Sequence, residues 1–130
     1  MQQEFGGENF TVVSWDRSLI GRAGYYIRLG VNPQDENDVI VMNSSFHRSK
    51  DGGKLFPITG GCGDCHDVWF DPKDGNRYVL TDDAGARIVN GENAQTVRLP
   101  NGQMYHIAVD NRVPYWIYGS RQDDGTMRGP

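Results

Sequence analysis

A 39-residue repeat constrains this chain more than any other feature of its sequence. The tripeptides that begin at Val31, Phe70 and Val109 read Val-Asn-Pro, Phe-Asp-Pro and Val-Asp-Asn, so each begins 39 residues after the previous one. An apolar segment precedes each of these turns, and a second apolar segment follows it. Periods of about 20–50 residues are typical of proteins built by stacking one supersecondary unit. We therefore expect three copies of one small unit.

The apolar segments have the composition of β-strands. The segments that follow the turns lie at 39–42, 78–80 and 115–118 and are rich in β-branched and aromatic residues. Seventeen glycines and the lack of a long apolar stripe with helical period also favour strands and turns, with only a short stretch at 15–20 suited to a helix. The sequence therefore predicts an all-β protein of β-propeller blades, with four-stranded antiparallel sheets and about three blades per chain.

The repeat also predicts how the chain is divided. We expect an N-terminal tail, a lead-in strand, two blades and a partial blade, at 1–9, 10–22, 23–61, 62–100 and 101–130, so that 10–130 forms the propeller part. Propellers typically close with 4–8 blades. The predicted blades would therefore close as a homo-oligomer, for example with two protomers making a six-bladed ring, or as part of a longer protein. In the first case the strand at 10–15 would complete the third blade of a neighbour.

One turn has the pattern of an Asp-box, S-x-D-x-G-x-x-aromatic. Its defining residues are Ser49, Asp51, Gly53 and Phe56. Asp51 would accept hydrogen bonds from the turn's own backbone, Gly52 and Gly53 would take positive φ, and Phe56 would anchor the returning strand in a core. We interpret these residues as structural. An ordinary Asp-Gly hairpin is the alternative.

A decayed copy of this turn is expected at 90–97. Glu92 replaces the Asp, Ala94 replaces the second Gly and Val97 replaces the aromatic residue.

Several further segments resemble one family. They are Ile20–Tyr26, Gly63–Pro72 (GDCHDVWFDP), Gly102–Asn111 (GQMYHIAVDN), Pro114–Gly119 and Gln122–Gly125. From Leu19 to Pro130 the chain resembles the Asp-box (BNR) repeat propellers, which include sortilin-like and glycosyl-hydrolase-like proteins. The resemblance implies a propeller fold and a secreted or periplasmic location, although residues 1–7 lack the basic start and apolar core of a signal peptide.

Three polar residues occupy one repeat position. Arg28, Asp67 and His106 are spaced by 39 residues, so equivalent strands would present them around a central channel. We take Arg28, Asp67, Tyr105, His106 and Asp123 as candidate ligand-binding residues and Asp64, His66, Asp67 and His106 as catalytic candidates. The structural alternative is bonding between blades, with Arg28 paired to Asp67 and His106 bonded to a backbone carbonyl.

Cys62, Cys65 and His66 spell C-x-x-C-H, the attachment motif of c-type haem. That group needs a second axial ligand and a helical or loop-rich surround, whereas this motif enters a predicted strand. We therefore expect no haem. A Cys62–Cys65 disulfide is the expectation for an exported protein. Two Cys and one His are one ligand short of a tetrahedral metal site.

Two acidic turns, at 82–83 and 122–125, are candidate Ca²⁺ sites because carboxylate and carbonyl oxygens bind this ion. Solvated turns with Asx hydrogen bonds are the alternative.

Charge and hydropathy narrow the functional classes. A net charge of −4 with scattered arginines disfavours nucleic acid, and no apolar run reaches the roughly 18 residues of a membrane span. The favoured function is a non-catalytic propeller module for assembly and for binding a peptide, glycan or other partner.

The alternative function is a glycoside hydrolase, or a fragment of one, that acts through two carboxylates. Asp64, Asp67, Asp82 and Asp123 are the candidates, but their spacing singles out no pair.

Overall fold

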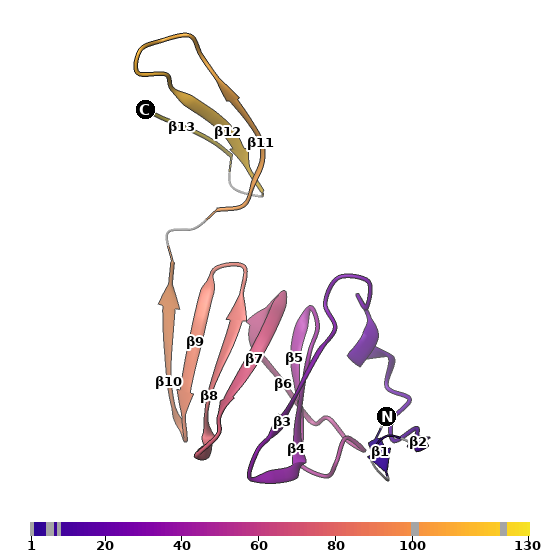
Figure 1. Cartoon of the computed structure of the whole chain (residues 1–130). Helices are drawn as coiled ribbons and strands as arrows, with labels where there is room; N and C mark the ends of the chain where they lie inside the picture. Colours follow the sequence, from indigo (N-terminus) through magenta and orange to yellow (C-terminus); the bar gives the residue numbers. More distant parts are fainter. Residues whose placement is uncertain (1, 5–6, 8, 100–101, 123–124) are drawn as a thin grey trace. The chain divides into compact units, whose positions relative to one another are not determined.

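The computed structural model describes residues 2–4, 7, 9–99, 102–122 and 125–130. The chain divides into two compact units, Met1–Leu99 and Pro100–Pro130. Each unit is built from antiparallel strands, and the prediction of an all-β protein is confirmed. Figure 1 follows the strands along the chain.

The first unit holds two four-stranded sheets, each of which runs in simple chain order. The first sheet contains β3 (Arg28–Asn32), β4 (Asp35–Met42), β5 (Ser45–Ser49) and β6 (Ile58–Gly63). The second sheet contains β7 (Cys65–Asp71), β8 (Asp74–Asp82), β9 (Gly85–Asn90) and β10 (Asn93–Arg98). Figure 1 shows these two sheets side by side.

The second unit is a third sheet of three described strands. They are β11 (Met104–Val109), β12 (Ile117–Arg121) and β13 (Thr126–Gly129), paired in that order. The strands of this sheet therefore correspond to the first three strands of each four-stranded sheet.

The N-terminal segment differs from the predicted lead-in strand. A short strand β1 (Gln2–Glu4) pairs with β2 (Asn9–Thr11), and the segment then forms a 3₁₀ helix η2 (Arg17–Ile20). Asp16 caps this helix, since its Oδ1 accepts hydrogen bonds from the Ser18 backbone N at 2.9 Å and from the Ser18 hydroxyl at 2.7 Å. This side-chain cap stabilises a helical turn in place of a longer strand.

The pairing register of the first two strands repeats with the sequence period. Arg28 lies opposite Met42 in the first sheet, Asp67 opposite Thr81 in the second, and His106 opposite Ser120 in the third. Each pair follows the previous one by 39 positions on both strands. The repeat seen in the sequence is therefore a repeat of backbone hydrogen bonding.

The turn after the first strand of each sheet begins with the same hydrogen bond. The side chains of Asn32, Asp71 and Asp110 each accept a hydrogen bond from the backbone N two residues later, at 2.9, 2.8 and 3.1 Å. Such Asx turns favour tight reversals because the side chain satisfies a backbone donor that the turn leaves unpaired. The Asn/Asp in each repeat thus fixes where the strand reverses.

The main core lies between the first and second sheets. Its residues come from both, and they are Ile40, Met42, Phe46, Cys65, Phe70, Tyr78, Leu80 and Val89. Strands β3 and β7 approach each other closely at Gly30, where a Cβ atom would lie 2.5 Å from Val68 Cγ1 and 3.5 Å from Phe70 Cε2. A larger residue at position 30 would therefore push the two sheets apart.

A buried carboxylate, Asp38, binds two cationic side chains beside this core. Asp38 is fully buried, and its two oxygens accept hydrogen bonds from Arg48 at 2.7 Å, while Lys50 lies 2.7 Å from Oδ2. Arg48 also reaches across to the second sheet, with its guanidinium 5.0 Å from the Tyr78 ring centroid and 3.1 Å from the Tyr78 hydroxyl. Burial alone would raise the pKa of Asp38, but hydrogen bonds from Arg48, Lys50 and Asn32 outweigh it and lower the pKa from 3.8 to about 2.

We expect Asp38→Asn to lower the free energy of unfolding by about 2–4 kcal/mol at neutral pH, since it leaves the buried Arg48 without its anion. The pKa of Asp38 is lower in the folded chain, so its contribution is present above about pH 4 and is lost as pH falls towards 2. Urea unfolding between pH 7 and 2 should therefore show a loss of roughly 2 kcal/mol in the wild type that Asp38→Asn lacks.

The control is Asp35→Asn, an exposed turn position where Asn can still accept the hydrogen bond from Asn37 N. It should keep both the stability and the acid transition of the wild type. Equal pH profiles for the wild type and Asp38→Asn would contradict the role assigned to this buried carboxylate.

The Asp-box sequence forms a closed hydrogen-bonded turn between β5 and β6. The Ser49 hydroxyl donates to Asp51 Oδ1 at 2.7 Å and accepts from Gly53 N at 2.9 Å, while Asp51 Oδ1 accepts from Lys54 N and Leu55 N at 3.0 Å each. These bonds, from the Leu55 backbone first and then from Ser49, lower the pKa of Asp51. The residues predicted to be structural therefore serve the turn itself.

The glycines of this turn adopt the predicted backbone. Gly52 and Gly53 have φ of 74° and 89°, a region in which a Cβ would be strained. Phe56, however, is only half-buried and lies outside the main core. It packs over Gly53 instead, where a Cβ would lie 4.0 Å from Phe56 Cζ.

The decayed copy at 90–97 does not form a second turn of this kind. Gly91 and Glu92 make a tight hairpin between β9 and β10, with Asn90 paired to Asn93. The physical reason is local: Ala94 takes the place of a glycine that needs positive φ, so the chain returns directly into a strand.

We expect Ser49→Ala to destabilise the fold by about 1–2 kcal/mol, because the fully buried hydroxyl satisfies the Gly53 N–H and orients Asp51. Lys54→Ala, an exposed substitution in the same turn, is the matched control and should change stability by less than about 0.5 kcal/mol. Chemical denaturation followed by tryptophan fluorescence measures both. Equal effects of the two substitutions would argue against this turn as a structural staple.

Candidate functional site

The candidate site lies where β7 begins, in the first unit. A disulfide joins Cys62 at the end of β6 to Cys65 at the start of β7, and Asp64 between them has a φ of 48°. Cys65 is fully buried in the core. Its backbone N donates to Asn43 O at 2.9 Å, which ties this junction to the turn between β4 and β5. The residues that follow Cys65 therefore leave the core at a fixed point.

Asn43 holds a second segment against the same place. Its fully buried side chain donates from Nδ2 to Leu19 O and Tyr26 O, both at 3.2 Å, and its Oδ1 accepts from Arg22 N at 3.2 Å. Three backbone groups of the 19–26 segment are thus bound by one amide. This arrangement positions the aromatic and basic side chains of that segment beside β7.

His66 and Asp83 form the shortest polar pair of the site. His66 Nε2 lies 2.6 Å from Asp83 Oδ1, joining the start of β7 to the turn between β8 and β9. Since an ionised carboxylate can only accept, this contact places a proton on Nε2 and fixes the orientation of the imidazole. The His66 side chain is 40% exposed, so the ring remains reachable by a ligand.

A second pair stands beside the first. Arg22 Nη1 lies 3.3 Å from Asp64 Oδ1, and the Arg22 guanidinium lies 5.0 Å from the Tyr26 ring centroid. The Tyr26 ring is in turn 5.1 Å from the imidazole of His66. Burial, followed by the nearby charges of Asp64 and Asp83, raises the pKa of Tyr26. The phenol therefore stays protonated and acts as a neutral wall between the two pairs.

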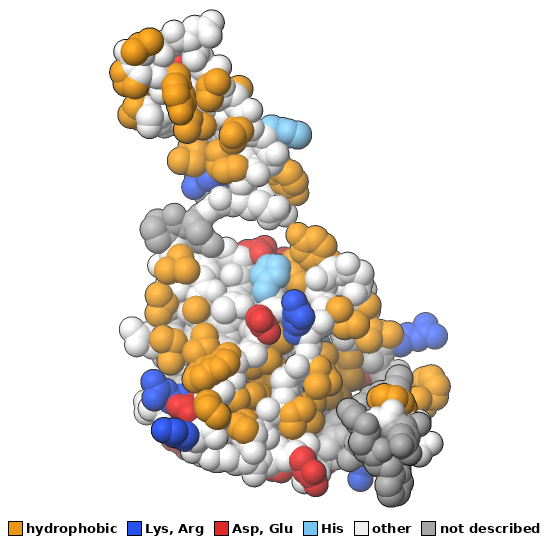
Figure 2. Space-filling view, in the orientation of Figure 1, with side chains coloured by type: hydrophobic (Ala, Val, Ile, Leu, Met, Phe, Trp, Pro, Cys, Tyr) orange, Lys and Arg blue, Asp and Glu red, His pale blue; other side chains and the backbone are white. Residues whose placement is uncertain are grey.

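An open cavity of about 420 Å³ adjoins these pairs. Its lining consists of Tyr25, Ile27, Arg28, His66 and Asp67. The cavity offers an exposed aromatic ring, a cation, an imidazole and one carboxylate within a single hollow, because strands β3 and β7 lie next to each other. Figure 2 shows a histidine, an acidic and a basic side chain gathered on the surface of the first unit.

The structure brings together three of the residues predicted from the repeat and its neighbours, namely Arg28, His66 and Asp67. Within the described residues no hydrogen bond or ion pair joins Arg28 to Asp67, so the expected bond between blades is not formed. Asp67 Oδ1 instead accepts from Val68 N at 2.9 Å. Both side chains are thus left facing the cavity.

Asp64 takes a different position from the one expected for a catalytic candidate. It pairs with Arg22 at the edge of the site and does not belong to the cavity lining. Tyr25, Arg22 and Asn43 were not predicted as site residues, and Asp83 was considered only as part of an acidic turn that could bind Ca²⁺. The sequence could have indicated one of these residues, Asn43, through the repeat, because Asn43 lies 39 positions before Asp82 at a matching turn.

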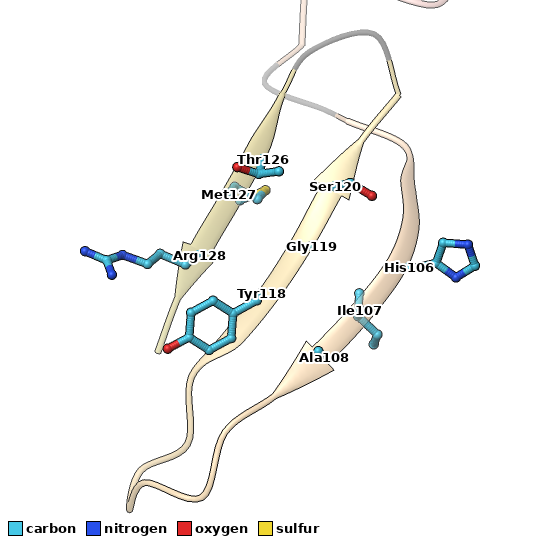
Figure 3. A pocket seen from close by; sticks show the side chains of 9 residues that line it. All are labelled: His106, Ile107, Ala108, Tyr118, Gly119, Ser120, Thr126, Met127 and Arg128. Carbon is cyan, nitrogen blue, oxygen red and sulfur yellow. The ribbon is translucent and has the colours of Figure 1, made fainter.

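Two further candidates belong to the second unit. Tyr105 and His106 lie on β11, and both are exposed. His106 borders a shallow hollow of about 630 Å³ on the third sheet, together with Ala108, Tyr118 and Arg128 among others. Figure 3 shows the side chains of His106 and Arg128 pointing in opposite directions, so they do not converge on one ligand atom. Asp123 lies outside the described residues.

The motifs for metals and haem can be placed in the structure. The sulfurs of Cys62 and Cys65, which a c-type haem would need for its thioethers, are bonded to each other. Asp82 Oδ1 accepts from Ala84 N and Gly85 N, as in an ordinary Asx turn, while Asp83 pairs with His66. In the part of the chain that the structure describes, no three His, Cys, Asp or Glu side chains gather in a group that could hold a metal ion.

Comparisons with models of protein families, with curated proteins and with solved structures find no match for this chain. The described helical structure contains nothing long and apolar enough to cross a membrane as a helix.

Proposed function

We propose that the chain is a non-catalytic module of β-propeller blades that assembles with copies of itself and binds a ligand at the His66 cavity. One observation carries this proposal: the register between the first two strands, and the Asx hydrogen bond that ends the first strand, recur at the same 39-residue spacing in all three sheets. Repeated sheets of simple up-and-down order are the units from which propellers are built.

The proposed family is the Asp-box repeat proteins. The Ser49–Asp51–Gly53 turn supports this assignment, because these three residues of the motif each take part in a hydrogen bond within the turn. The turn lies between the third and fourth strands of its sheet. A family assignment of this kind concerns architecture and does not by itself transfer an activity.

The chemistry of the cavity favours an oligosaccharide as ligand. Sugars are bound by stacking on an aromatic face while their hydroxyls bond to charged and amide groups, and Tyr25 is 64% exposed beside Arg28, His66 and Asp67. A peptide is the competing ligand, and the same residues would meet it. The His66–Asp83 bond keeps the imidazole in place for either.

A glycoside hydrolase would need two carboxylates facing one bond, about 5–5.5 or 6.5–9.5 Å apart. Among the described residues the cavity lining provides one, Asp67. The binding function is therefore the one that the geometry supports better.

We expect Tyr25→Ala and Arg28→Ala each to weaken oligosaccharide binding about tenfold, because Tyr25 supplies the aromatic face of the cavity and Arg28 supplies its cation. Calorimetry with neutral and acidic oligosaccharides, and with peptides as the second panel, measures this. Arg98→Ala, an exposed arginine on β10, is the matched control and should bind as the wild type does.

Two results would overturn this assignment. Peptide binding that depends on Tyr25 and Arg28, without oligosaccharide binding, would replace the proposed ligand. Release of reducing sugar that Asp67→Asn abolishes would favour the glycoside hydrolase instead.

We also expect the chain to form a closed oligomer in solution. Light scattering should give a multiple of the 14.6 kDa chain mass, with two protomers corresponding to six blades. A mass of one chain at micromolar concentration would contradict the assembly.

A further inference from the structure

We propose that the Leu29–Val31 face of the first sheet packs against the third sheet of a second copy of this chain, in a head-to-tail contact. This inference rests on the proposed assembly and assigns the two surfaces that form it. We call the two surfaces the leading face, defined by Leu29 and Val31, and the trailing row, defined by Ala108, Tyr118 and Arg128.

The leading face is apolar and uncovered. Leu29 is 62% exposed and Val31 is 45% exposed, and both lie on β3, the first strand and one edge of its sheet. In an extended strand alternate residues share a face, so these two project away from Gly30, which faces the second sheet. Two exposed aliphatic residues side by side on a strand mark a surface suited to burial.

The second sheet shows what covers this position in the repeat. Val68 and Phe70 stand 39 residues after Leu29 and Val31, and they pack against the first sheet beneath Gly30. Phe70 is only 9% exposed as a result. Burial of this repeat position therefore accompanies the contact of the second sheet with the first; the equivalent residues of the third sheet, Ile107 and Val109, are 67% and 61% exposed.

The surface that covers Val68 and Phe70 is a cross-strand row. Gly30, Ile40 and Arg48 lie directly opposite one another on β3, β4 and β5, and Arg48 extends from this row onto Tyr78 of the second sheet. Residues directly opposite one another in antiparallel strands project from the same face. This row is what a blade presents to the next one.

The third sheet carries the equivalent row. Ala108, Tyr118 and Arg128 lie opposite one another on β11, β12 and β13, and Ala108 follows Gly30 by two repeats of 39 residues. All three border the hollow of about 630 Å³ shown in Figure 3. Arg128 and Arg48 also contact residues at the same repeat position. Arg48 binds Asp38, and the Arg128 guanidinium lies 5.3 Å from the ring of Trp116, which follows Asp38 by two repeats.

Small residues stand at the same place in the two contacts. In the internal contact a residue without a side chain, Gly30, faces Val68. In the contact between copies Ala108 would face the larger Leu29, so the two sheets would lie farther apart than the first and second sheets do. Because one copy supplies the leading face and the other the trailing row, the contact is heterologous, and repeated contacts of this type form a ring when the rotation between copies closes and an open filament when it does not.

Cross-linking between two differently marked chains tests this pairing. One chain carries Leu29→Cys and the other carries Ala108→Cys with an affinity tag, and the mixture is treated with a short bismaleimide. The native cysteines are bonded to each other and do not react. We expect a cross-linked pair that contains both chains, with the joined peptides at 29 and 108 found by mass spectrometry. Each chain alone should give no cross-linked pair.

The matched control replaces the first chain by Leu55→Cys, an exposed leucine of similar accessibility, 67% against 62%. It should not join to Ala108→Cys. Similarly, Leu29→Arg should raise at least tenfold the protein concentration at which light scattering shows the oligomer to dissociate, whereas Leu55→Arg should leave that concentration unchanged.

The possible failures are distinguishable. A wild-type chain of single-chain mass would overturn the assembly and this contact together. An oligomer without a 29–108 product would overturn the contact alone. Cross-linking of Leu29→Cys with itself would also overturn it, since that result indicates a symmetric interface in which the leading face meets its own copy.

Discussion

The close approach of β3 to β7 is the constraint on which the rest of the first unit depends. Only a glycine at position 30 leaves room for Val68 and Phe70, and this approach closes the core that contains Ile40, Met42 and Leu80. It also sets where the second sheet begins. Since Cys65 is buried in that core, the residues that follow it reach the surface beside the first sheet, which creates the cavity lined by Arg28, His66 and Asp67.

Polar contacts then select this packing from other ways of stacking two apolar sheets. Asp38 is buried with Arg48 and Lys50 on it, and Arg48 extends to Tyr78 of the neighbouring sheet. A shift of one sheet relative to the other would break the contact of Arg48 with Tyr78, whereas the Asp38–Arg48 pair lies within the first sheet and would persist. The hydrophobic contacts supply most of the burial, while this network fixes the alignment.

The candidate site belongs to no single repeat. Asn43 from the first sheet holds the 19–26 segment, the Cys62–Cys65 disulfide holds the start of β7, and Asp83 comes from the second hairpin of the second sheet. Each of these groups is structural by itself. Their meeting produces a surface with an oriented imidazole, an arginine and a tyrosine ring. The proposed binding site and the fold therefore share residues here, whereas the hydrogen bonds of the Asp-box turn lie within the turn itself.

The sequence by itself determined the strand content, the 39-residue period and the turns, because these depend on local chemistry. The Asx turns after Asn32, Asp71 and Asp110 and the positive φ of Gly52 and Gly53 are properties of a few adjacent residues. The decayed turn at 90–97 was predicted wrongly: the chain closes a shorter hairpin at Gly91 and Glu92, because Ala94 replaces a glycine that the longer turn needs.

Only the tertiary structure decided which polar residues meet. His66 and Asp83 are separated by 17 residues, and Arg22 and Asp64 by 42. No periodicity links either pair. Likewise, nothing in the sequence distinguishes the carboxyl of Asp38. Burial raises its pKa, but folding also brings hydrogen bonds from Arg48, Lys50 and Asn32, and these lower the pKa to about 2. Contacts between distant segments depend on how sheets pack, and a one-dimensional pattern fixes the sheets without fixing their packing.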